Sequence, residues 1–181
     1  MIVRVERPSS TNQVLSIDTP SAAWTIDAID ALVGAVAASA GLGVDWAQDV
    51  RIAVHEAFMN ALLHGNEQNE SRRISLRVSL GVEGIEVDVQ DQGQGFEPSA
   101  VPDPRAAQNL SRSCGRGLLF MRALMDEVTF LRHTAGGTYV RMRKRRSPAH
   151  AARVKGQGVS SATVPGTLPP SPTPPGGRRE S

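Results

Sequence analysis

The sequence predicts an α/β two-layer sandwich in which helices cover one face of a mixed, mostly antiparallel sheet. Three observations lead to this fold class. Alternating apolar and polar residues mark strands, and apolar residues at steps of three and four mark helices. Two short strand-like stretches come first, and the segments then follow as helix, helix, strand, strand, helix, strand, strand. The length of 181 residues is sufficient for one domain with a substantial core.

The first half of the chain contains two predicted strands and two predicted helices. Loose alternation predicts short strands at residues 2–6 and 13–18. An alanine-rich segment, residues 24–40, has apolar residues at helical spacing and is followed by glycines, which predicts the first helix. The same spacing predicts a central helix within residues 49–66. Gly65 stands where a left-handed cap would end that helix.

The second half is predicted to contain two hairpins separated by one helix. Residues 72–80 and 85–91 both alternate and are joined by a glycine-containing turn, which favours an antiparallel pair. Residues 115–125 show a helical pattern. Residues 128–131 and 138–142 alternate again on either side of two adjacent glycines, and they predict the final hairpin.

Composition divides the chain into a domain and its two flanking segments. We expect the domain at residues 13–146, a strand or arm at residues 1–12, and a disordered tail at residues 147–181, which is rich in Pro, Gly, Ser and Arg. Residues 141–181 carry nine Lys or Arg and one acidic residue, so they hold a net charge of +8 and leave −6 for the first 140 residues. A direct nucleic-acid contact would rest on this tail alone, which lacks interleaved aromatic residues. We therefore expect none.

The remaining composition favours a cytoplasmic protein. No apolar run approaches the roughly 20 residues of a transmembrane helix, so we expect no membrane insertion. The N-terminus lacks the apolar segment of a signal peptide. Cys114 is the only cysteine and cannot form an internal disulfide, and no Cys/His cluster predicts zinc.

The central helix carries three polar residues at intervals of four, namely Glu56, Asn60 and His64. Residues at this spacing stack along one side of a helix. A carboxamide oxygen can ligate Mg²⁺, and a carboxylate can take a proton from an attacking hydroxyl. Taken alone, a Glu and an Asn four residues apart more often mark a solvated helix face. For His64, a contact with the last helical carbonyls is at least as plausible as a functional role.

Two glycine-containing blocks follow downstream. Asp91 ends a predicted strand and begins the run DQGQGF, in which a buried carboxylate could accept a hydrogen bond from an exocyclic amine. An Asp-x-Gly turn without any ligand is the more frequent meaning of such a run. The second block, Gly115-Arg116-Gly117, precedes a helix whose free N–H groups could hold phosphates, or it could form a simple hinge. No Walker loop is present in the sequence.

In this order and at these separations, the three blocks resemble the N box and the two glycine boxes of the histidine-kinase-like (GHKL) ATPase superfamily, which includes gyrase, Hsp90, histidine kinases and MutL. The resemblance implies the Bergerat ATP-binding fold, an ATP lid at residues 97–114 and Mg-ATP as the bound nucleotide. It implies Glu56 as the catalytic base, Asn60 as the Mg²⁺ ligand and Asp91 as the reader of the adenine amino group. The ATP-binding residues that it implies are Asn60, Asp91, Gly93, Gly95, Phe96, Gly115, Arg116, Gly117, Leu118 and Thr138. Arg116 could instead contact a partner or only solvent, and Thr138 could be a plain strand residue.

Within that superfamily the chain is similar to the anti-sigma factor serine/threonine kinases, the RsbW-like family. The similarity covers about residues 13–144 and is most specific in the run VPDPRAAQNLSRSCGRGLLFMRALMDEV. It implies a protein that binds a sigma factor and phosphorylates an anti-anti-sigma (STAS-type) partner on Ser or Thr, often as a homodimer. Two alternatives stay open. One is a non-catalytic or ATP-independent module that sequesters a partner, and the other is an ATPase that phosphorylates histidine.

Overall fold

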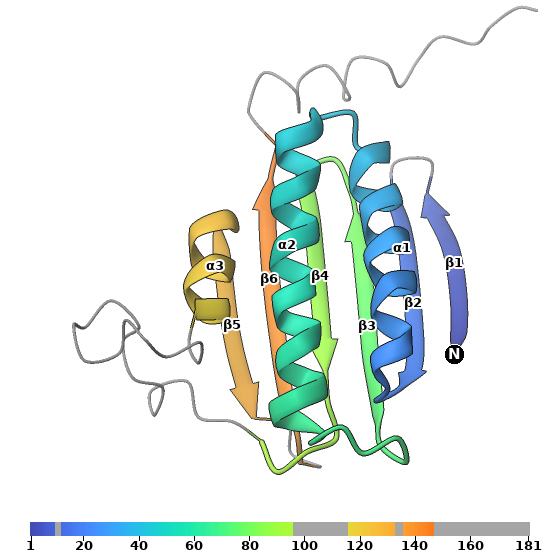
Figure 1. Ribbon diagram of the computed structural model, residues 1–181. Coiled ribbons are helices and arrows are strands. Elements are labelled where there is room, and N and C mark those ends of the chain that lie inside the picture. Colours follow the sequence, from blue (N-terminus) through green and yellow to red (C-terminus); the bar gives the residue numbers. More distant parts are fainter. Residues whose placement is uncertain (10–11, 96–115, 133–135, 147–181) are drawn as a thin grey trace, which may run out of the picture.

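The computed structural model describes residues 1–9, 12–95, 116–132 and 136–146. They form two layers, with three α-helices packed on one face of a six-stranded sheet (Figure 1). The predicted two-layer α/β class is confirmed. The Pro-rich tail, which was predicted to be disordered, lies outside the described residues.

The sheet has the strand order β1-β2-β3-β4-β6-β5. Its strands are β1 (Ile2–Ser9), β2 (Asn12–Pro20), β3 (Arg73–Leu80), β4 (Gly84–Gln90), β5 (Glu127–Arg132) and β6 (Thr138–Arg145). All neighbouring strands pair antiparallel, so the expectation of a mixed sheet was wrong. The reason is the last hairpin, in which β6 returns between β4 and β5 and runs antiparallel to both.

The helical layer begins with a short 3₁₀ turn. Its elements are η1 (Ala23–Thr25), α1 (Ile26–Ser39), α2 (Val44–Asn60), the π-helical turn η2 (Ala61–Gly65) and α3 (Arg116–Leu124). Within the described ranges, no helix combines the length and the apolar content that a membrane span requires.

The core lies between the helices and the inner face of the sheet. Val78 pairs with Leu15 on one side and with Val87 on the other, and all three are buried. Because strand side chains alternate between faces, this register places one apolar row beneath the helices. Val54 and Phe58 of α2 pack against this row, and each is 1% exposed. Burial of each such side chain contributes about 1.5–3 kcal/mol.

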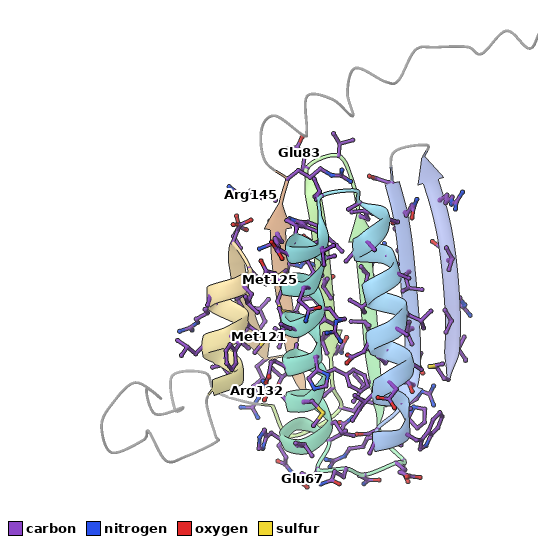
Figure 2. All side chains as sticks on the ribbon, turned by 45° about the horizontal axis from the view of Figure 1, so that its top comes forward. Glu67, Glu83, Met121, Met125, Arg132 and Arg145 are labelled. Carbon is purple, nitrogen blue, oxygen red and sulfur yellow. The ribbon has the colours of Figure 1, made fainter. Side chains whose placement is uncertain are left out.

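Helix α3 is held against the domain at its C-terminal end. Met121 of α3 and Met125, which follows the helix, are buried, and Figure 2 labels both between α3 and α2. Lys144 of β6 donates a hydrogen bond to the Leu124 carbonyl (2.6 Å) and pairs with Asp49 of α2 (3.0 Å). These contacts fix α3 beside α2, so the N-terminal end of α3 reaches the polar side of α2.

The outer face of the sheet is polar and carries cross-strand ion pairs. Arg141 of β6 donates two hydrogen bonds to Asp88 of β4, at 2.8 and 3.1 Å. The hydrogen bond to Asp88 raises the pKa of Arg141 above its ordinary value. Beside this pair, burial and the negative charge of Asp88 raise the pKa of Tyr139. The apolar face of the sheet therefore lies toward the helices, and the other face is suited to water.

Candidate active site

Asp91 lies immediately after β4, at the end of the molecule where η2 stops. Its side chain is 3% exposed. Oδ1 accepts hydrogen bonds from the backbone N–H of Gly93 (2.9 Å) and of Thr138 (3.0 Å). Among the described residues, Oδ2 accepts no hydrogen bond. Two amides therefore hold this carboxylate by one oxygen, and the described residues leave the other oxygen to an outside donor.

Three glycines close around Asp91 because the backbone approaches it from three sides. A Cβ atom at Gly65 would collide with the Asp91 carboxylate, and one at Gly137 would collide with the Asp91 carbonyl. A Cβ atom at Gly93 would collide with the Gly65 carbonyl. Gly65 does not have positive φ, so its predicted role as a left-handed cap was wrong. The helix needs glycine there because only a residue without a side chain leaves room for Asp91.

The Thr138 hydroxyl is a second unusual polar group beside Asp91. Thr138 is 4% exposed, and its Oγ1 atom has no hydrogen-bond partner among the described residues. Buried polar atoms in folded proteins are almost always hydrogen-bonded, so an unpartnered one needs an explanation. A ligand or a bound water at this position would supply the missing partner, which fits the predicted nucleotide-binding role of Thr138.

Glu56 and Asn60 lie on α2, both half-buried, and face the first turn of α3. A Cβ atom at Gly117 would lie 2.7 Å from Glu56 Oε2 and 3.4 Å from Asn60 Nδ2. Glycine at this position therefore lets α3 approach both polar side chains. The structure brings together Glu56, Asn60 and Gly117, three of the residues that the resemblance placed in one site.

His64 does not share this arrangement. It lies in the π turn η2 and is exposed, and within the described ranges its ring makes no hydrogen bond to a helical carbonyl. A π turn holds one residue more than an α-helical turn, so later positions rotate by about one residue. The next residue, Gly65, is buried and lies against Asp91.

The other predicted site residues are described in part. Gly95 has φ of 85° and is followed by the undescribed segment, while Arg132 donates a hydrogen bond to the neighbouring Gln94 carbonyl (3.0 Å). Leu118 is half-buried against the core. Phe96, Gly115 and the whole of the predicted lid lie outside the described residues, as does the side chain of Arg116, which begins α3.

The sequence reasoning assigned no role to Asn66, although the structure buries it completely beside the site. Asn66 is 0% exposed. Its Oδ1 accepts a hydrogen bond from the Gln92 amide (2.8 Å), and its Nδ2 donates to the Arg73 carbonyl (2.9 Å). The only local signal was its position after Gly65, which is also typical of an ordinary helix end.

Comparison with known protein families identifies the class to which this fold and site belong. Residues 19–144 match the family described as histidine kinase-like ATPase domain. The match covers more than half of the chain and includes each of the sequence blocks that carried the resemblance. The chain therefore belongs to the histidine kinase-like ATPase domain family, whose members bind ATP.

Curated relatives narrow this class. The chain is 31% identical over 127 residues to the serine-protein kinase RsbW of Staphylococcus epidermidis, which covers 66% of this chain and 80% of that protein. It is 32% identical over 105 residues to the anti-sigma F factor of Clostridium botulinum, covering 56% of this chain and 73% of that protein. These names agree with the family predicted from the sequence.

A solved structure supports the fold. The crystal structure of the RsbU and RsbW domains of Rv1364c from Mycobacterium tuberculosis aligns with a TM-score of 0.51 and 20% sequence identity. The alignment covers 73% of this chain and 32% of that one. At this level of identity the likeness concerns the fold alone.

Proposed function

We propose that this protein is an ATP-dependent serine/threonine kinase of the GHKL type that acts as an anti-sigma factor. It holds a sigma factor inactive and phosphorylates an anti-anti-sigma partner of the STAS type on Ser or Thr. The names of its relatives support this assignment. One structural observation carries it. The continuous segment α2–η2 presents Glu56 and Asn60 to the start of α3, and Gly65 to Asp91.

The end of the site at Asp91 suits an adenine ring. Oδ2 of Asp91 can accept a hydrogen bond from the exocyclic amino group, and the Thr138 hydroxyl offers a second polar contact. A guanine ring presents a carbonyl oxygen in the corresponding position, where it would face a carboxylate without a shared proton. Because a buried polar group left unpaired is costly, the site rejects GTP.

The end of the site at Asn60 suits the phosphates. The Asn60 side-chain oxygen would hold Mg²⁺ together with phosphate oxygens, and the metal would neutralise the charge on the transferred group. The described residues contain no group of three His, Cys, Asp or Glu that could bind a metal by themselves. This fits magnesium, which usually keeps water ligands and shares the substrate phosphates.

Glu56 supplies the acid–base chemistry. Its carboxylate lies one helical turn before Asn60 and takes the proton from the Ser or Thr hydroxyl of the partner as that oxygen attacks the γ-phosphate. The bond from the γ-phosphorus to the oxygen that bridges it to ADP breaks as the new P–O bond forms, so ADP leaves. Two sets of residues would enclose the nucleotide. One set lies around the start of α3 (Gly115, Arg116, Gly117 and Leu118), and the other follows β4 (Gly93, Gly95 and Phe96).

The decisive test is a titration of the purified protein with Mg-ATP, followed by phosphotransfer. We expect binding by the wild type, weaker binding by Asp91→Asn and Asn60→Ala, and normal binding but no phosphotransfer by Glu56→Ala. The phosphorylated partner should keep its phosphate in acid, because phosphoserine survives acid and phosphohistidine does not. An absence of ATP binding would instead favour an ATP-independent sequestering module.

A homodimer and the outer limits of the domain also belong to this proposal. β1 is an edge strand, and Ile2, Val3 and Val5 are 55%, 39% and 66% exposed. An exposed apolar edge suits extension of the sheet by a second copy. Light scattering of the wild type and Val5→Lys tests the dimer, because a charge at this edge should favour the monomer.

We also place the domain at residues 13–146, and we propose that the protein acts in the cytoplasm.

A further inference from the structure

We propose that Asn66 is a positioning residue that maintains the nucleotide selectivity of Asp91. The inference rests on the proposed function, since it concerns how the adenine-reading carboxylate is held. Asn66 touches neither Asp91 nor the predicted ligand positions by any hydrogen bond between described residues. It acts through the backbone of Gln92, the residue that follows Asp91.

Asn66 joins three segments that are distant in the sequence. Its backbone N–H donates to the Ala61 carbonyl (2.7 Å), which anchors it to the π turn. Its side-chain Oδ1 accepts a hydrogen bond from the Gln92 N–H, and its Nδ2 donates one to the carbonyl of Arg73 at the start of β3. The Gln92 side chain completes a closed ring, because its Oε1 accepts a hydrogen bond from the Arg73 N–H (2.8 Å). Both polar atoms of the buried Asn66 carboxamide, Oδ1 and Nδ2, are therefore hydrogen-bonded.

The ring of hydrogen bonds through Asn66, Gln92 and Arg73 sets the direction of the next backbone amide, that of Gly93. Gln92 is held by its backbone and its side chain, so the peptide that leads into Gly93 has little freedom. The Gly93 N–H is one of only two donors to Asp91 Oδ1 in the described part of the chain, and the other is the Thr138 N–H from β6. With both donors in place, the carboxylate is held from two sides and Oδ2 keeps one direction. Loss of the Gly93 donor would leave a single contact, about which the carboxylate can turn.

The chemistry of the side chain explains why asparagine is needed here. The position requires an acceptor for the Gln92 N–H and a donor for the Arg73 carbonyl, and a carboxamide supplies both. Alanine supplies neither. Aspartate keeps the acceptor but loses the donor and adds a buried charge, so Asn66→Asp should lower stability while still holding Gln92. Selectivity and stability should therefore separate between these two variants.

The test combines nucleotide binding with amide exchange in the nucleotide-free protein. For Asn66→Ala, at a temperature where circular dichroism shows a folded protein, we expect the ratio of the GTP and ATP dissociation constants to fall about tenfold, the effect of one hydrogen bond to a charged group. We also expect hydrogen exchange at the Gly93 amide to become at least about tenfold faster. Asn66→Asp should keep both values near those of the wild type. Thr25→Val is the matched control, because Thr25 is equally buried and, among the described residues, its hydroxyl bonds only the Ala22 carbonyl (2.7 Å) near the start of α1.

The two readouts separate the possible failures. Unchanged exchange at Gly93 in Asn66→Ala, or an unchanged selectivity ratio in a wild type that binds ATP, refutes the positioning role. An equal loss of selectivity in Thr25→Val also refutes it, since the effect would then be general destabilisation. Absence of ATP binding by the wild type refutes the proposed function and the selectivity role with it, while the exchange measurement still reports whether Asn66 holds the loop.

Discussion

Substitution of Gly65 by alanine tests the central packing contact of the site. The added Cβ would collide with the Asp91 carboxylate and would lie 2.9 Å from the Asp91 Cβ. A short side chain held by two amides cannot swing away without losing at least one of these bonds. Overpacking costs about 1–3 kcal/mol, and a lost hydrogen bond to a charged group costs about 1.5–3 kcal/mol. Alanine in a helical turn returns about 1 kcal/mol. We therefore expect a net loss of about 1.5–5 kcal/mol.

Thermal and chemical denaturation measure this loss. The expected fall in Tm is roughly 5–15 °C, and ATP affinity should fall as well because the displaced carboxylate is the proposed adenine contact. Gly34→Ala in α1 is the matched control. A Cβ there would lie 3.5 Å from Arg51 Cδ, an ordinary contact, so this variant should gain about 0.5–1 kcal/mol. The reasoning is refuted if Gly65→Ala keeps both the wild-type stability and the wild-type ATP affinity.

Three further substitutions probe single groups. Thr138→Val removes a hydroxyl that has no partner among the described residues, so stability should change by less than about 1 kcal/mol. The ATP affinity, measured by calorimetry, should fall. A large loss of stability with unchanged ATP affinity would contradict this role. Tyr139 has a raised pKa in the folded protein, so its contribution to stability is present below its unfolded pKa of about 10 and is lost as the pH rises through the folded value. Urea unfolding at increasing pH should therefore show a smaller loss of stability for Tyr139→Phe, and an identical profile would exclude this role. Gln68 adopts φ of 56°, so Gln68→Gly should raise stability or leave it unchanged, because glycine relieves about 1 kcal/mol of left-handed strain; a marked decrease in Tm would show that the side chain is needed.

Local patterns predicted most of the fold because strand alternation and helical spacing are properties of neighbouring residues. The strands predicted at residues 72–80 and 85–91 are found as β3 and β4, and the final hairpin is found as β5 and β6. The direction of β6 relative to β4 could not be read in the same way. It depends on how the chain returns after α3, which local periodicity does not encode, and this is why a mixed sheet was expected.

The candidate site was predictable where the side chain of a single residue supplies the proposed chemistry. Asp91, Glu56 and Asn60 are polar residues at positions where the surrounding pattern predicts burial or a shared helix face. The structure places Asp91 in a buried, hydrogen-bonded position and places the other two against Gly117. Asn66 could not be found in this way, because its partners are backbone groups of Arg73 and Gln92, and backbone groups leave no trace in a sequence.

The π turn interrupts the row of residues at intervals of four in which the sequence placed Glu56, Asn60 and His64. Spacing of four residues would place His64 in line with Glu56 and Asn60. In the structure Glu56 and Asn60 face Gly117, His64 is exposed, and Gly65 lies against Asp91. The continuous segment α2–η2 therefore reaches both the proposed phosphate end and the proposed adenine end of the site. Its irregular geometry belongs to the arrangement of the site, and it is invisible to any reading based on regular periodicity.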